Sequence, residues 1–156
     1  MKNRYFPEED IQSDDLLFVC YMIERIARKL HQKNRYVVNT IGKDAMEHLL
    51  SVANVLHAEN PLDVEDDWIK EYKLQNGSFD ILDVEKGLVS QIPTALQMGK
   101  VYHRLIKDTA LSDENYAEGI FRVYNHEICD VIDNYNCSAY FEPSYVIARA
   151  YQAGGF

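Results

Sequence analysis

Apolar side chains recur every three or four positions along most of the chain, which is the spacing of one face of an α-helix. The same spacing predicts helices over 13–32, 43–58, 61–73, 93–107, 113–125 and 143–154. The segment 34–41 is a short helix or a turn, and 128–135 continues the pattern after a break near Asn125. The chain is therefore predicted to be all-α, with five to seven helices around one core.

Residues at the predicted helix ends support this pattern. Ser13 and Ser112 are expected to cap the helices that follow them, and Asn60 precedes Pro61 at the start of another. Gly99 lies inside a predicted helix, where glycine costs about 1 kcal/mol relative to alanine. Its presence there indicates that another helix packs closely against it.

The segment 74–92 is the one long stretch without helical periodicity. It contains Asn76-Gly77, the strongest short-range hairpin signal, so a two-stranded ribbon near 74–82 and a plain turn are both open. We predict a single domain over 1–156, with this segment as the seam between a helical part at 13–73 and another at 93–156.

Composition excludes several classes of protein. The 156 residues are 47% apolar and 26% charged, which is typical of a globular domain and not of a disordered chain. The net charge of −9 argues against tight sequence-independent binding to nucleic acid, where neutralisation of phosphates dominates the affinity.

Three cysteines, Cys20, Cys129 and Cys137, form no C-x-x-C pair and are odd in number, as expected for reduced thiols in the cytoplasm. The N-terminus has no apolar core of a secretory signal. The longest apolar run, 16–23, is far shorter than the about 20 residues of a membrane span. We therefore expect a soluble cytoplasmic protein.

Several stretches resemble a family of small, uncharacterised helical bacterial proteins. The resemblance covers about two thirds of the chain and rests on segments 17–24, 54–59, 63–67, 99–106, 135–138 and 140–154, which include Leu56-His57 before an acidic helix. It implies an antitoxin-like or accessory protein of a bacterial or phage operon, and no catalytic residues to carry over.

Arg25 and His31 suggest an alternative, enzymatic function. Their spacing is similar to the R-x(4–6)-H signature of helical HEPN ribonucleases, which use the histidine near the ribose 2′-hydroxyl and the arginine at the phosphate. On one continuous helix, however, the two side chains lie about 240° apart. Cations that complement the helix dipole explain the same residues without catalysis.

No motif predicts a metal or a cofactor. The chain has no Glu-x-x-His and no His-Glu-x-x-His, and the acidic run 63–67 lacks the glycine of a calcium loop. Glu127, Asp130 and Asp133 are interpreted as local helix support. His57 is expected to fix the turn between two helices by bonding a backbone carbonyl or Asp63.

Aromatic residues crowd the C-terminal part of the chain. Seven of eleven tyrosines follow residue 101, and tyrosine is enriched at protein interfaces. We predict partner contacts at Tyr135, Tyr140, Phe141, Tyr145 and Tyr151. The favoured function is a non-enzymatic protein that masks a partner, with acidic residues steering a basic toxin or nuclease. A structural homo-oligomer is a further alternative.

Overall fold

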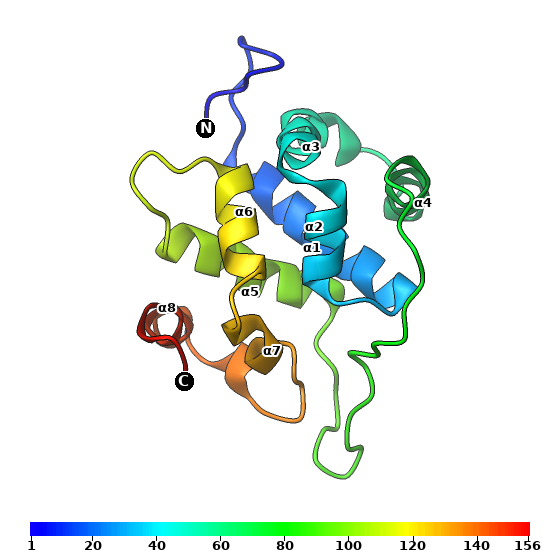
Figure 1. Ribbon diagram of the computed structural model, residues 1–156, viewed down its shortest axis with the longest axis vertical. Coiled ribbons are helices and arrows are strands. Elements are labelled where there is room, and N and C mark those ends of the chain that lie inside the picture. Colours follow the sequence, from blue (N-terminus) through cyan, green and yellow to red (C-terminus); the bar gives the residue numbers. More distant parts are fainter.

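The computed structural model describes all 156 residues, and its only regular elements are helices (Figure 1). None of them is long and apolar enough to cross a membrane. The eight α-helices are α1 (Ser13–Leu30), α2 (Asn34–Ile41), α3 (Lys43–Leu56), α4 (Pro61–Glu71), α5 (Ala95–Asp108), α6 (Tyr116–Tyr124), α7 (Ile128–Ile132) and α8 (Ser144–Ala153), with a 3-10 turn at Ala139–Phe141.

The all-α prediction is confirmed, but the expected number of helices was slightly too low. The segment 34–41 forms a helix of its own, and the last apolar stretch before Tyr135 separates from α6 as the five-residue α7. The break near Asn125 separates these two helices because Asn125 ends α6 and its side chain bonds back to the Phe121 carbonyl at 2.9 Å.

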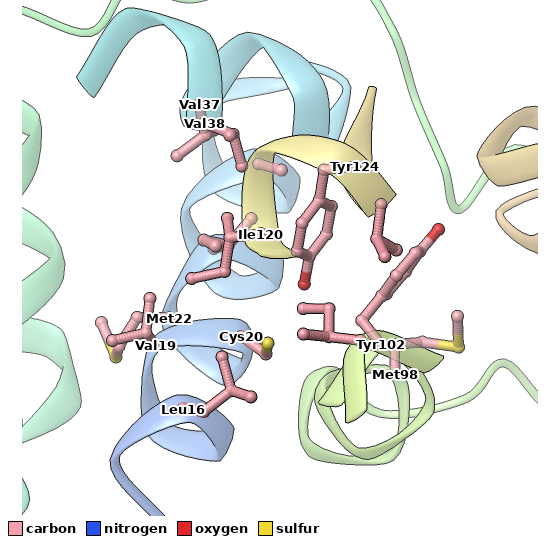
Figure 2. Close-up of a cluster of buried hydrophobic side chains, with 14 of the residues drawn as sticks. Leu16, Val19, Cys20, Met22, Val37, Val38, Met98, Tyr102, Ile120 and Tyr124 are labelled. Atoms are coloured by element: carbon pink, nitrogen blue, oxygen red, sulfur yellow. The ribbon is translucent and has the colours of Figure 1, made fainter. Parts of the chain in front are cut away.

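Helix α1 forms the centre of the molecule. It packs most extensively against α5 and also contacts α2, α3 and α4 (Figure 1). Only Asp14 and Lys29 of its 18 residues are exposed. The apolar core is continuous and draws on both 13–73 and 93–156. Figure 2 shows part of it, where the stacked rings of Tyr102 and Tyr124, 4.5 Å apart, lie beside Cys20 of α1.

Close packing between α1 and α5 depends on Gly99. A Cβ atom at this position would lie 3.0 Å from both the backbone nitrogen and the Cα of Tyr21. These are main-chain atoms of the central helix, which cannot move aside as a flexible side chain can. The glycine indicated by the sequence as a packing position is therefore the contact point of the two helices that pack most extensively against each other.

We predict that Gly99→Ala destabilises the protein, although alanine is the better helix former. The overpacking cost of about 1–3 kcal/mol exceeds the propensity gain of about 1 kcal/mol. Urea unfolding followed by circular dichroism measures the difference. Gly87→Ala is the control, because a Cβ there meets nothing within 4 Å. An unchanged or higher stability of Gly99→Ala would contradict this account of the interface.

Two helix starts differ from the predicted ones. Helix α1 begins with a capping box at Gln12, in which the Asp15 carboxylate accepts the Gln12 backbone N–H at 2.7 Å. Ser13 is therefore the first helical residue and not the cap. Helix α6 begins after Asn115, whose side chain accepts the Glu118 N–H at 2.8 Å, and Ser112 does not cap it. Asn60 caps α4 as predicted, by accepting the Leu62 N–H.

The ribbon considered near 74–82 does not form. The N–H groups of Gly77 and Phe79 donate instead to the carbonyls of Leu30 and His31, at 2.8 and 2.9 Å. Carbonyls at a helix C-terminus lack partners within the helix, so this segment satisfies the end of α1. A Cβ at Gly77 would lie 2.7 Å from the His31 carbonyl oxygen. Glycine is therefore required here for close approach and not for a hairpin.

Candidate functional site

Arg25 and His31 do not form a common site. The Arg25 guanidinium forms an ion pair with Glu65 of α4 and donates to the Tyr21 hydroxyl at 2.8 Å. His31 is the exposed residue that ends α1 in a left-handed conformation, with φ 54°. No contact joins the two side chains, and each has a structural role that explains its position.

His57 contacts a different partner from the one expected. Its Nε2 atom lies 3.8 Å from the Asp15 carboxylate, and its ring packs on Phe18 at 4.5 Å between centroids. Asp63 is exposed on the first turn of α4. The histidine therefore connects the end of α3 to the start of α1, and it forms no bond to Asp63.

The five aromatic residues predicted as partner contacts fall into two groups. Tyr135 is 2% exposed, and its hydroxyl accepts from Arg28 at 3.0 Å, so it belongs to the core. Tyr151 is half-buried, with its ring against His126 at 4.3 Å and beneath the Arg122 guanidinium.

The remaining three lie close together in the sequence and are at least partly exposed, and we call them the aromatic face: Tyr140, Phe141 and Tyr145. Phe141 is 82% exposed and Tyr145 is 64% exposed, while Tyr140 is half-buried and packs edge-on against Tyr135. Beside Tyr140 and Phe141 lies a groove of about 310 Å³, whose other walls include Ile92, Pro93 and Val101.

A second feature is a polar cluster inside the helical core, which we call the acidic cluster: Glu24 of α1, Asn34 of α2 and Asp133 after α7. Asp133 accepts the Tyr102 hydroxyl at 2.6 Å and the Asn34 amide at 3.3 Å, one on each carboxylate oxygen. Glu24 is 1% exposed and faces the Arg28 guanidinium at 3.8 Å. One fully buried carboxyl group and one partly buried carboxyl group thus share this region with a partly buried arginine.

Burial controls the protonation of the acidic cluster. It raises the pKa of Glu24 from 4.5 to about 7, although the positive charge of Arg28 opposes the shift. Burial, reinforced by repulsion from Glu24, also raises the pKa of Asp133 well above its usual value, against the hydrogen bond from Tyr102. Both carboxyl groups therefore hold a proton more tightly than they would in water.

Several polar atoms of this region are buried without a hydrogen-bond partner. They are both carboxylate oxygens of Glu24, Nε of Arg28, Oδ1 of Asn34 and the Tyr124 hydroxyl. Buried polar groups are nearly always hydrogen-bonded, so a concentration of unpaired ones in one place is unusual. Asn34, Tyr124 and Asp133 also line a pocket of about 270 Å³ that opens to the surface.

Sequence reasoning missed the acidic cluster. Glu24 lies four positions after Cys20 and three before Ala27, on the apolar stripe of the predicted helix. A carboxylate on such a stripe was the available signal. Asn34 and Asp133 are 99 positions apart and could not be joined without the fold. The sequence interpretation of Asp133 as local helix support is wrong, because its hydrogen-bond partners lie on α2 and α5.

Comparison with known proteins adds no further assignment, because no family model, curated protein or solved structure matches the chain.

We predict that the free energy of unfolding falls as the pH rises from about 4.5 to about 7 and above. The folded state binds more protons than the unfolded chain in this range, and each carboxyl group contributes at most about 1.4 kcal/mol per pH unit. Urea unfolding at a series of pH values measures the slope. Glu24→Gln should flatten it, while Glu59→Gln, at an exposed position, should not. Equal slopes for wild type and Glu24→Gln would show that Glu24 titrates normally.

Proposed function

We propose that this chain is a non-enzymatic binding protein that masks a protein partner at the aromatic face, as an antitoxin-like or accessory component of a bacterial or phage system. The observation that carries the proposal is the exposure of Phe141 beside an apolar groove, together with the exposure of Tyr145 at the start of α8. Large aromatic side chains around such a groove are typical anchors of protein interfaces.

The groove follows one side of helix α5. Gln97, Lys100 and Val101 line it, and the neighbouring hollow of about 210 Å³ adds Arg104 together with Ile147 of α8. These positions on α5 are spaced at three and four residues, so they form one continuous stripe. A segment of a partner lying along this stripe would contact α5, α8 and the aromatic face at once.

Charge indicates the chemistry of that segment. Lys100 and Arg104 have no ion-pair partner within the molecule, although acids outnumber bases in the chain as a whole. We infer a partner that is basic overall, and so attracted to the net charge of −9, with a carboxylate next to its apolar anchor. The carboxylate would pair with Lys100 or Arg104.

No observation favours the ribonuclease alternative, because Arg25 is occupied by Glu65 and Tyr21 and does not contact His31. The binding function is therefore the one tested first.

We predict that replacing both Phe141 and Tyr145 by alanine removes capture of the partner without loss of fold, since both rings are exposed. The tagged wild type and the double variant are used as bait in a lysate of the cells that naturally produce the protein, and bound proteins are quantified by mass spectrometry. A hot-spot pair of this kind is expected to lower affinity by about tenfold or more.

Val55→Ala/Leu62→Ala is the matched control bait, because it removes two similarly exposed apolar side chains on α3 and α4. A protein retained by wild type and control but lost by the double variant supports the proposal. Equal recovery by all three baits would contradict it. Recovery of the chain itself, with a doubled mass by light scattering, would replace the partner by a second copy.

A further inference from the structure

The pocket above the acidic cluster is separate from the aromatic face. It has a volume of about 270 Å³ and is walled by α2, by the segment 79–84, by α6 and α7, and by Tyr135. Phe79, Ile81 and Tyr135 provide apolar and aromatic surface, while Asn34 and Asp133 provide polar atoms. A volume of this size accommodates a small molecule or one long side chain and not a folded segment.

A hydrogen-bond acceptor at this pocket lacks a donor. Asn34 lines the pocket, is 4% exposed, and has no partner for its Oδ1 atom. Glu24 lies behind Asn34 and Tyr135 and does not itself line the pocket. Leaving buried acceptors without donors is costly, so a bound group that supplies N–H donors would be favoured here.

The charged residues around the pocket leave an excess of negative charge. Three carboxylates, Asp80, Asp83 and Asp130, line it against two cations, Lys33 and Arg35. Asp133 adds a fourth carboxyl group, whose raised pKa favours the neutral form as long as no cation is bound. Both cations bond to the same Asp130 oxygen, at 3.3 and 2.7 Å. Asp80, Asp83 and Asp133 have no cation of the protein within ion-pair distance.

The protein itself places an ammonium group at this pocket. Lys33 Nζ lies 5.5 Å from the centroid of the Phe79 ring while it bonds to Asp130. The π-surface of an aromatic ring next to a carboxylate is a recurrent environment for organic cations. A metal ion would need several converging oxygen ligands, and no three histidine, cysteine or acidic side chains stand close enough together to hold one.

We propose that this pocket binds an organic cation with a primary ammonium group on an alkyl chain. The ammonium donates to Asn34 Oδ1 and to Asp133, whose carboxyl group releases its proton to solvent as the cation binds. The alkyl chain packs on Ile81 and the aromatic walls. A free diamine and a lysine side chain of a peptide offer the same chemistry, and the experiment separates these two sources.

Isothermal titration calorimetry of the full chain tests the proposal. The three compounds titrated are putrescine, its neutral analogue butanediol, and a short alanine peptide that contains one lysine. Binding of putrescine alone identifies a free amine as the ligand, and binding of the peptide alone identifies a lysine side chain. Butanediol should not bind. Failure of both putrescine and the peptide to bind would overturn the proposal.

Two variants with matched controls test the site itself. Asp133→Asn should weaken binding by about tenfold or more, while Asp67→Asn, an exposed acid on α4, should leave it unchanged. Lys33→Met should tighten binding because it removes the internal ammonium, and Lys70→Gln, which removes an exposed charge elsewhere, should not. Equal affinities within each pair would overturn the assignment. If Asp133→Asn does not fold, the comparison of Lys33→Met with Lys70→Gln tests the proposal by itself, because both lysines are exposed.

Discussion

A helix that is surrounded by other helices has almost no side on which to place a charge. Helix α1 is in this position, since α2, α3, α4 and α5 all pack on it. Its acid Glu24 therefore lies in the core, next to Arg28, Asn34 and Tyr135. Ionised carboxylates are strongly disfavoured in such surroundings. The polar groups that α2 and the region after α7 direct inward, Asn34 and Asp133, are consistent with this constraint.

Much of the fold could be predicted because helical periodicity is local. The spacing of Leu16, Cys20 and Ile23 defines α1 within a few residues of its true end, and Gly99 indicated close packing before its neighbour Tyr21 was known. The segment 74–92 could not be predicted in the same way. Its N–H groups bond to the end of α1, more than 40 positions earlier, and an Asn-Gly pair carries no sign of that.

The candidate sites were predicted to different extents for a related reason. The high number of aromatic residues after position 101 indicated the region of Phe141 and Tyr145. It does not tell which of these side chains are exposed and which are buried in the core. Tyr135 turns inward because Arg28 provides a donor for its hydroxyl. The acidic cluster depends on contacts between residues from position 24 to position 133, and only the folded chain brings them together.

The pocket above this cluster takes its walls from α2, α6, α7 and the segment that follows α4, and so from both sides of the predicted seam. No fragment of the chain contains it. Occupancy of such a pocket is coupled to the folding equilibrium of the entire molecule, because a ligand that binds only the native state raises the apparent melting temperature, by an amount that grows with the logarithm of the ligand concentration above its Kd. The ligand would therefore act as a thermal stabiliser of the whole fold, including helices such as α8 that it does not touch.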